Sequence, residues 1–368
     1  MNIPNLKDFE EKKRRLRQFM AENGYDYTIL ARRDNFAWFT GGGDSKVLRN
    51  SDTGFGILVI SRENVYFIAQ FMDMARIADD ELTGLDIEKI TLKWQDASRE
   101  EAALGLCRGG KVAADFDWPG ADNRLKDLVQ LHYPFTDLEI ERYTRVGALC
   151  DKMLKAVADR IHPGMTEHEI EAEILFEYGK ENMTPKVLLV GSDERIAKYR
   201  HPNASPKKVE KLVLLHPGAE KWGLHANITR MVYFGDKLPE DLQHKYDLLN
   251  LCEAQAMAMC RPGVRYHDIL EERRRIFRES GCEEEFFNHY PGVITGYYFV
   301  DAQPIINNEA VVERIAYDWF ITVTGAKVEE LSISDPKGAK LLSATGVWPV
   351  KEYCYKGFKY NLPIIYQR

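Results

Sequence analysis

The segment LVLLHPGAEKWGLHANITRMVYFG, residues 212–235, decides how the chain folds. It predicts a strand from Leu212, a turn around Gly218, and a second strand that begins near Asn227. Polar side chains at His216 and Asn227 interrupt these otherwise apolar strands. The segment therefore predicts two neighbouring strands that carry candidate site residues.

An internal repeat surrounds this segment. Residues 162–164 (HPG) precede residues 168–170 (HEI), and residues 261–263 (RPG) precede residues 267–269 (HDI) with the same spacing. Each copy follows a predicted helix, opens another and then runs into strands. Such a repeat predicts two similar halves packed about a pseudo-twofold axis, with a pocket between them. The alternative is that Pro-Gly before a helix is simply common.

The first part of the chain has a different pattern. Short apolar strands and helices alternate along it, which predicts a small α/β domain. Near residues 133–135 (YPF) the alternation stops, and a long helix is predicted from Asp137 to Ile161, with Asp137 as its N-cap. We therefore predict an N-terminal α/β domain over residues 1–135 and a second domain over residues 136–368.

Composition limits the classes of partner. The 368 residues carry a net charge of -7, with 45% hydrophobic and 29% charged residues and no basic block. Phosphate binding needs clustered Lys and Arg, so no nucleic-acid partner is expected. No stretch approaches the roughly 20 apolar residues of a membrane span, and the polar N-terminus is unlike a signal peptide. Six scattered cysteines fit a reducing cytosol, so we expect a soluble cytoplasmic protein.

Further motifs occur in a fixed order along the chain. They are an aromatic-then-glycine run at residues 35–42, His201, Gly218, Gly223, Thr229-Arg230, HYPGVITGYY at residues 289–298 and GAKVEE at residues 325–330. Together they resemble the creatinase/prolidase/aminopeptidase P family, the M24 or pita-bread proteins. The resemblance spans nearly the whole chain. It implies a mixed α/β fold, with a creatinase-type N-terminal domain, a pita-bread domain with a curved antiparallel sheet, and a homodimer.

The chain departs from this family at the metal ligands. Family peptidases hold two divalent metal ions with two Asp, one His and two Glu. Matched by motif, those positions are His216, Asn227, Val293, Phe320 and Glu329, with Asp318 two residues from Phe320. Valine and phenylalanine donate no lone pair, whereas two adjacent Mn, Co or Zn ions need several anionic oxygens and an imidazole. The resemblance therefore implies a scaffold without the dinuclear metal site, and no cofactor is expected.

One metal-binding alternative stays open. A single weakly held ion can use His216 and Glu329, together with His225 or Asp318. His225 is otherwise expected at the surface.

His201 and Glu329 are the predicted catalytic residues. His201 matches a histidine that family members keep outside the first metal shell and that is the base in creatinase, a metal-free member. A neutral imidazole suits proton transfer near pH 7; a structural histidine beside Arg200 and Pro202 is the alternative. An unpaired buried carboxylate is costly, so Glu329 needs a cation from the chain or from a guanidinium or ammonium group of a substrate.

Other polar residues are predicted to contact the substrate. Within the chain, the candidates to face Glu329 are Arg230, Lys327 and a protonated His216. His289 matches a histidine that often lines the substrate side of the family's pocket, and aromatic packing is the alternative for it and its tyrosine neighbours. The predicted substrate-binding residues are His216, Asn227, Arg230, His289, Tyr297 and Lys327. Asp301 is a further candidate for a polar contact.

Two functions follow from the resemblance and its departures. The first is a metal-independent, creatinase-like hydrolase of a C–N bond in a small polar or cationic molecule. In that reading His201 activates water and Glu329 anchors a cationic group. The second is a pseudoenzyme that binds a peptide or metabolite without turnover. An Xaa-Pro dipeptidase with a metal centre is a third alternative, and its label would rest on the fold alone.

Overall fold

The structure is a computed structural model that describes residues 5–298 and 309–368. The chain forms two compact units. The N-terminal unit is Met1–Glu139 with Trp222–Leu224, and the C-terminal unit is Ile140–Lys221 with His225–Arg368. Among the described residues, no helix combines the length and the apolar character that a membrane crossing requires.

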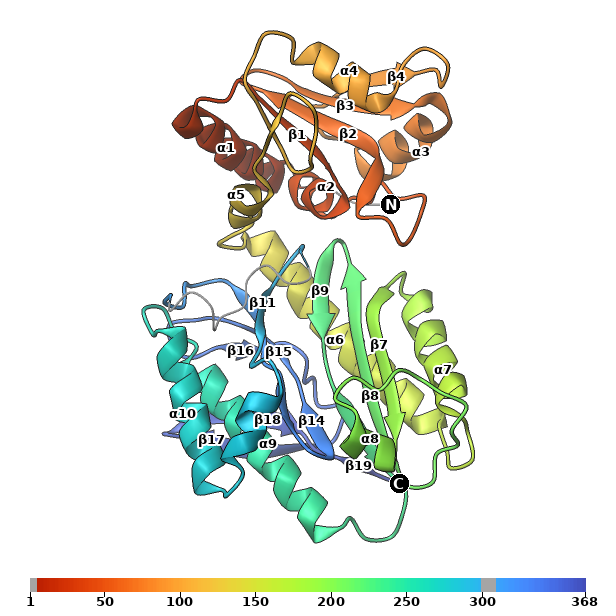
Figure 1. Cartoon of the computed structure of the whole chain (residues 1–368), viewed down its shortest axis with the longest axis vertical. Helices are drawn as coiled ribbons and strands as arrows, with labels where there is room; N and C mark the ends of the chain where they lie inside the picture. The colour runs from red at the N-terminus through yellow and green to blue at the C-terminus, as the bar shows by residue number, and fades with distance from the viewer. Residues whose placement is uncertain (1–4, 299–308) are drawn as a thin grey trace. The chain divides into compact units, whose positions relative to one another are not determined.

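The N-terminal unit is a small α/β unit around one sheet (Figure 1). Its six strands have the order β4-β3-β2-β1-β5-β6. They are β1 (Tyr27–Arg32), β2 (Thr53–Ser61), β3 (Val65–Gln70), β4 (Glu88–Leu92), β5 (Val112–Ala114) and β6 (Asp122–Asn123). The helices are α1 (Leu6–Asn23), α2 (Arg33–Thr40), α3 (Phe71–Glu81), α4 (Arg99–Leu106) and α5 (Leu125–Gln130). The alternation of strands and helices predicted this mixed α/β architecture.

The core of the N-terminal unit lies on both faces of its sheet. Ile29 of β1 and Val59 of β2 are fully buried with Ala103 of α4 on one face. Phe67 of β3 is buried too, and its ring centroid lies 5.8 Å from that of Phe36 in α2. Successive side chains of a strand point to opposite faces, so apolar residues along β1, β2 and β3 pack against helices on both faces of the sheet.

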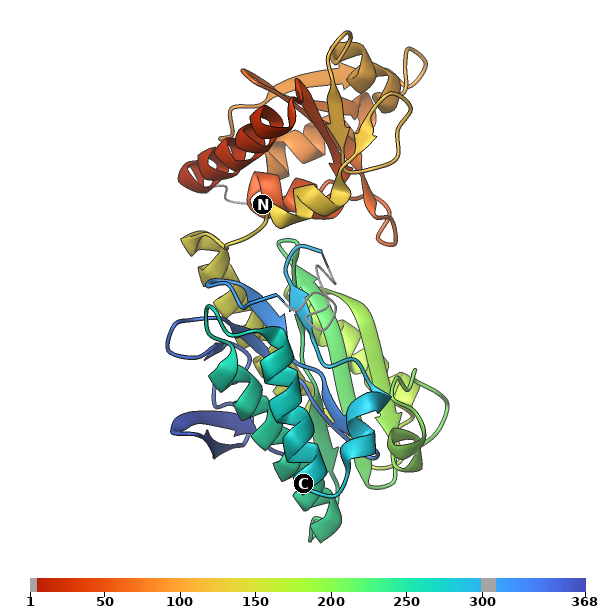
Figure 2. The ribbon, with the colours of Figure 1, turned by 60° about the vertical axis from the view of Figure 1, so that its left-hand side comes forward.

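The C-terminal unit combines curved, mostly antiparallel sheets with long helices (Figures 1 and 2). Its helices are α6 (Asp137–Arg160), α7 (Glu167–Lys180), α8 (Glu194–Lys198), α9 (Glu240–Met259), α10 (Tyr266–Glu279) and the 3-10 helix η1 (Glu283–Asn288). One sheet has the order β19-β10-β8-β7, with β9 paired to β8, and another has the order β11-β12-β15-β16. Two further hairpins are β13-β14 and β17-β18.

The strands of this unit follow one another in short segments. They are β7 (Thr184–Ser192), β8 (Leu212–Lys221), β9 (Leu224–Asn227), β10 (Arg230–Tyr233), β11 (Val293–Thr295), β12 (Ala316–Asp318), β13 (Ile321–Val323), β14 (Ala326–Val328), β15 (Leu331–Ile333), β16 (Lys340–Leu341), β17 (Val350–Tyr355), β18 (Phe358–Pro363) and β19 (Tyr366–Gln367). Almost every residue of β8 to β15 is buried, so polar side chains on these strands are held inside the unit.

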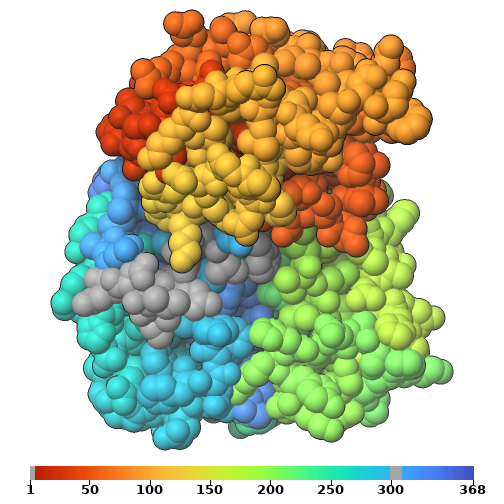
Figure 3. Space-filling view, turned by 45° about the horizontal axis from the view of Figure 1, so that its top comes forward, coloured from red at the N-terminus to blue at the C-terminus, as the bar shows by residue number. Residues whose placement is uncertain are grey.

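The predicted repeat is present in the C-terminal unit. Gly164 precedes α7 with φ 92°, and Gly263 precedes α10 with φ 86°. Their N–H groups donate to equivalent partners, Val209 O at 2.8 Å and Val311 O at 2.9 Å. Helix α6 leads into α7 as α9 leads into α10. In Figure 3 the green first half and the cyan-to-blue second half meet along one face. The pseudo-twofold halves are confirmed.

Two local predictions need correction. Strand β8 continues through Gly218, which pairs with Val187 of β7, and the chain turns instead at Trp222-Gly223, where both residues have positive φ. Long strand pairing therefore overrides the local preference of Pro-Gly for a turn. The cap of α6 is Thr136 and not Asp137, because Glu139 N–H donates to Thr136 Oγ1 at 3.3 Å.

Candidate functional site

The short strands of the C-terminal unit bring polar residues from both halves together. We call this set the central cluster: His216 in β8, Asn227 at the end of β9, Thr229 before β10, Asp318 at the end of β12, Lys327 in β14 and Glu329 directly after β14. The backbone N–H of Thr229 donates to Glu329 O at 3.1 Å and ties the two halves at this point. All six side chains are buried.

Glu329 is the hub of the central cluster. Its Oε2 lies 3.1 Å from His216 Nδ1 and 3.2 Å from Lys327 Nζ, and it accepts a hydrogen bond of 3.2 Å from Thr229 Oγ1. His216 Nδ1 also lies 2.9 Å from Thr229 Oγ1. The cation that a buried glutamate needs is therefore Lys327, one of the candidates from the chain itself.

The charges of the central cluster follow from burial and from Lys327. Burial raises the pKa of Glu329, but the positive charge of Lys327, followed by the contact with His216, outweighs burial and brings this pKa to about 2. Burial, assisted by Lys327, lowers the pKa of His216, and Glu329 opposes that shift only in part. Near neutral pH the cluster thus holds an anionic Glu329 beside a neutral imidazole, in place of the protonated His216 that was one candidate.

The second carboxyl group of the central cluster, Asp318, has a raised pKa, whereas that of Glu329 is lowered. Asn227 Nδ2 donates to Asp318 Oδ2 at 2.7 Å. Burial, followed by the negative charge of Glu329, raises the pKa of Asp318 well above its ordinary value, against the hydrogen bonds from Asn227. Paired acids whose environments push their pKa values apart can take different protonation roles. The surroundings therefore shift the pKa values of the two carboxyl groups in opposite directions.

The structure brings Asp318, two residues before Phe320, into the central cluster. Asp318 pairs with Val293 between β11 and β12 and accepts a hydrogen bond from Asn227 Nδ2. Phe320 has neither contact among the described residues. The Phe320 ring lies 5.8 Å from the His289 ring and 5.8 Å from Lys327 Nζ.

Two acceptor oxygens of the central cluster are buried without a hydrogen-bond partner among the described residues. They are Glu329 Oε1 and Asn227 Oδ1. Buried acceptors are normally satisfied by a donor. A ligand or water that brings N–H or O–H groups would meet that need.

A pair of histidines lies beside a cavity of about 540 Å³. His201, in the loop after α8, and His289, directly after η1, place their Nε2 atoms 3.1 Å apart. Both line the cavity, whose other walls are Arg200, Phe286, Phe287, Asn288, Tyr290 and Pro291. Burial, then the charge of Lys327, lowers the pKa of His201 and brings that of His289 to about 4. Two of the predicted site residues therefore form a neutral imidazole pair next to an accessible space.

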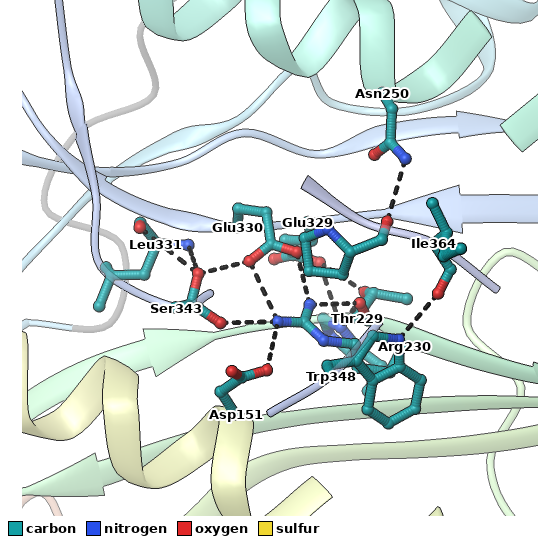
Figure 4. Close-up of polar contacts among 12 residues, drawn as sticks. Asp151, Thr229, Arg230, Asn250, Glu329, Glu330, Leu331, Ser343, Trp348 and Ile364 are labelled. Carbon is teal, nitrogen blue, oxygen red and sulfur yellow. Dashed lines mark hydrogen bonds and ion pairs between the residues drawn. The ribbon is translucent and has the colours of Figure 1, made fainter. Parts of the chain in front are cut away.

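The structure pairs Arg230 with carboxylates other than Glu329 (Figure 4). Its guanidinium donates to Thr229 O at 2.9 Å and to Ser343 O at 2.7 Å. It forms ion pairs with Asp151, at 3.2 Å, and with Glu330. Arg230 is fully buried, and its guanidinium group is bound by these partners inside the unit. It is therefore not part of the proposed site.

Other predicted residues have mixed placements. Tyr297 is buried two residues after β11 and is not among the residues that line the cavity in the described part of the chain. His225 is buried in β9, so its expected place at the surface is wrong. Asp301 lies outside the described residues. Sequence reasoning missed Thr229 as a contact of Glu329 and missed the Phe286-Phe287 wall, although the aromatic pair just before Asn288-His289 was a visible signal.

The donor set does not match the dinuclear metal centre of the family's peptidases. Among residues 5–298 and 309–368, no group of three or more His, Cys, Asp or Glu lies close enough to hold a metal ion. Val293 offers no donor, and Lys327 places its own positive charge on Glu329. Two adjacent divalent ions need several anionic oxygens, which these residues do not supply.

Comparisons with known proteins match the chain in two parts. The profile of the Creatinase/Prolidase N-terminal domain matches residues 12–132, and that of Metallopeptidase family M24 matches residues 141–325. An uncharacterized peptidase of Staphylococcus saprophyticus is 26% identical over 206 residues, 54% of this chain and 58% of that protein. An Xaa-Pro dipeptidase of Pyrococcus horikoshii is 23% identical over 360 residues, 91% of this chain and 97% of that protein.

Solved structures share the fold across almost the whole chain. The Xaa-Pro dipeptidase from Bacillus anthracis superposes with a TM-score of 0.74 at 19% identity, covering 98% of this chain and 100% of that one. The prolidase from Pyrococcus horikoshii has a TM-score of 0.73 at 19% identity, with 90% and 98% covered. Both units and the family profiles agree, and the chain belongs to metallopeptidase family M24, with a creatinase/prolidase N-terminal domain.

Proposed function

We propose that this chain is a hydrolase that acts without a dinuclear metal centre on a C–N bond of a small polar or cationic molecule. The observation that carries the proposal is the ion pair of Lys327 with Glu329. A lysine ammonium and a metal ion compete for the same carboxylate. In this chain Lys327 supplies the positive charge beside Glu329. The imidazoles of His201 and His289 are still present and can accept and donate protons.

His201 is the proton acceptor in this proposal. It takes a proton from water, and the water oxygen forms a bond to the carbon of the C–N bond. That bond then breaks with its electron pair on nitrogen, which receives the proton back from His201. The lowered pKa of His201 keeps its imidazole neutral near pH 7, the form that a general base requires.

The central cluster supplies binding and charge. Lys327, and Asp318 with its raised pKa, are groups that can stabilise negative charge developing on the substrate. The acceptor oxygens Glu329 Oε1 and Asn227 Oδ1 lack a donor among the described residues, which favours a ligand that carries N–H groups. The cavity walls of Phe286, Phe287 and Tyr290 suit an apolar part of the same ligand.

The test is turnover of a substrate panel after chelation. The panel holds Xaa-Pro dipeptides, guanidino compounds such as creatine, and simple amides, with released amine detected by mass spectrometry. We expect turnover that chelators leave unchanged and that His201→Ala lowers by about 10²- to 10⁴-fold. His168→Ala, at an exposed histidine of α7, is the matched control. Loss of turnover on chelation, with recovery on Mn²⁺, would contradict the proposal and favour the Xaa-Pro metallopeptidase.

A binding protein without turnover is the second candidate. Glu329 already has its cation in Lys327, and Val293 makes the former ligand position apolar. Both features favour a pocket that holds a peptide or metabolite and does not hydrolyse it. Thermal shift with the same panel, followed by product analysis, separates the two candidates: a shift without product supports the binding protein. The homodimer and the cytoplasmic location stay predictions.

A further inference from the structure

The contact between His201 and His289 carries information about where hydrogen atoms lie. The Nε2 atoms of the two rings are 3.1 Å apart, and the rings meet edge to face with centroids 5.1 Å apart. Two neutral imidazoles hydrogen-bond through these atoms only if one Nε2 carries hydrogen and the other presents a lone pair. The pair therefore has two possible arrangements, and a third contact decides between them.

That third contact is the carbonyl oxygen of Tyr290. It lies 2.8 Å from His289 Nδ1. A carbonyl oxygen only accepts hydrogen bonds, so His289 Nδ1 must carry the hydrogen. In a neutral imidazole the other nitrogen, His289 Nε2, then has the lone pair and accepts.

The same reasoning continues to His201. Since His289 Nε2 accepts, His201 Nε2 must carry hydrogen and donate across the 3.1 Å contact. The lone pair of a neutral His201 is left on Nδ1. Among the described residues, no group is recorded within hydrogen-bond distance of that atom. His201 is exposed, so Nδ1 is free to take a proton from water or a ligand.

We propose that the Tyr290 carbonyl and His289 form a relay that fixes the tautomer of His201, with Nδ1 as the atom that accepts the proton. His289 is then a positioning residue, because it acts through His201 and need not touch the reacting atoms. A histidine base is oriented and held in one tautomer by the hydrogen bond at its other nitrogen. The inference rests on the proposed function for its catalytic consequence, while the tautomers themselves are independent of any substrate.

The direct test is a long-range ¹H–¹⁵N correlation spectrum of the full chain labelled with ¹⁵N in its histidine rings. We expect hydrogen on Nε2 of His201 and on Nδ1 of His289 at pH 7. Signals are assigned by their loss in His201→Ala and His289→Ala. His162 is an internal reference, because its Nδ1 lies 2.9 Å from the carbonyl of the next residue while its ring is exposed. Hydrogen on His201 Nδ1, or averaged shifts for the two nitrogens, would overturn the proposal.

Two substitutions at His289 separate positioning from packing. His289→Gln keeps an amide oxygen that accepts from His201 Nε2–H, so His201 keeps its tautomer. His289→Leu removes the acceptor, so the Nδ1–H form of His201 becomes populated. Once a substrate is known, kcat falls about tenfold in the leucine variant and recovers to within about threefold in the glutamine variant. An unchanged His201 tautomer in His289→Leu contradicts the relay.

The two proposals fail in different ways. Wrong tautomers in the wild-type spectrum overturn the relay and leave metal-free hydrolysis open. The expected tautomers together with no turnover of any panel member overturn the proposed hydrolase alone.

Discussion

At the scale of single residues, the central cluster contains two buried carboxyl groups that the chain treats in opposite ways. Lys327 lowers the pKa of Glu329 to about 2, whereas burial and the negative charge of Glu329 raise the pKa of Asp318 well above its ordinary value. Replacing an ionised partner of a buried pair leaves an uncompensated charge, but replacing a protonated acid by its amide changes little. The two isosteric amide substitutions therefore differ in their effect on stability.

We predict that Glu329→Gln lowers the free energy of unfolding by about 3 kcal/mol at pH 7, because Lys327 loses its buried anion. Asp318→Asn is expected to change it by less than about 1 kcal/mol, since Asn227 Nδ2 still finds an amide oxygen to accept its hydrogen bond. Urea unfolding at pH 7 measures both. Equal losses in the two variants would show that Asp318 is ionised as well.

The depressed pKa of Glu329 also sets an acid limit. Its ordinary pKa is 4.5 and its pKa in the folded chain is about 2. A carboxyl group with a depressed pKa contributes stability that is fully present above pH 4.5 and is lost as the pH falls toward 2. We predict that the stability difference between wild type and Glu329→Gln shrinks over that interval in urea titrations at a series of pH values. A constant difference would place the origin of the loss elsewhere.

At the scale of elements, two glycines lie in the turns that precede equivalent helices of the repeat, α7 and α10. Gly164 and Gly263 have φ of 92° and 86°, and a Cβ at either position would meet nothing within 4 Å. Strain in the backbone, without a clash, is thus the cost of a side chain there. We predict that Gly164→Ala and Gly263→Ala each cost about 1–2 kcal/mol, as measured by urea unfolding.

Gly179 is the matched control for these glycines. It lies inside α7, outside the positive-φ region, and a Cβ there also meets nothing within 4 Å. Alanine at this position is expected to stabilise the chain by about 0.5–1 kcal/mol. A loss at Gly179 as large as at Gly164 would mean that space, and not backbone conformation, decides the effect.

Element positions show what the sequence can predict. The helices α7 and α10 were found from Pro-Gly followed by His and an acidic residue, because capping and turn chemistry are local. The sequence did not decide between Phe320 and the nearby Asp318, since that choice depends on which residue of β12 faces Val293 across the sheet. Strand pairing between distant segments leaves no local mark, and a shift of one or two residues changes which side chain enters the site.

At the scale of the whole molecule, the motifs in fixed order were enough for the family and for both halves of the C-terminal unit. Four residues of the candidate site, His201, His216, Lys327 and Glu329, were named from the sequence, and their roles stay predictions. Their partners could not be predicted, because Lys327 and Arg230 were equal candidates to face Glu329. Only the three-dimensional structure shows that Lys327 forms an ion pair with Glu329 and that Arg230 forms one with Glu330.

Arg230 connects elements that are distant along the chain, and its removal gives the last prediction. It bridges Asp151 of α6, Glu330 beside β15 and the Ser343 carbonyl (Figure 4). Arg230→Met leaves two buried carboxylates without their cation, so we predict a loss of about 3–5 kcal/mol in the C-terminal unit. Lysine is expected to restore only part of it, because one ammonium cannot reproduce the guanidinium fork.

The loss in Arg230→Met should also depend on pH. Burial, opposed by Arg230, raises the pKa of Glu330 to about 7, and without Arg230 this pKa rises further. When the pKa of a carboxyl group is higher in the folded chain than in the unfolded chain, the free energy of unfolding falls as the pH rises between the two pKa values, because the unfolded chain loses its proton first. Arg230→Met is therefore less destabilised at pH 6, where Glu330 binds a proton, than at pH 8. Hydrogen exchange at both pH values locates the effect in α6 and β10, with the exposed pair variant Lys237→Met as control. Equal losses at both pH values would mean that Glu330 stays ionised without Arg230.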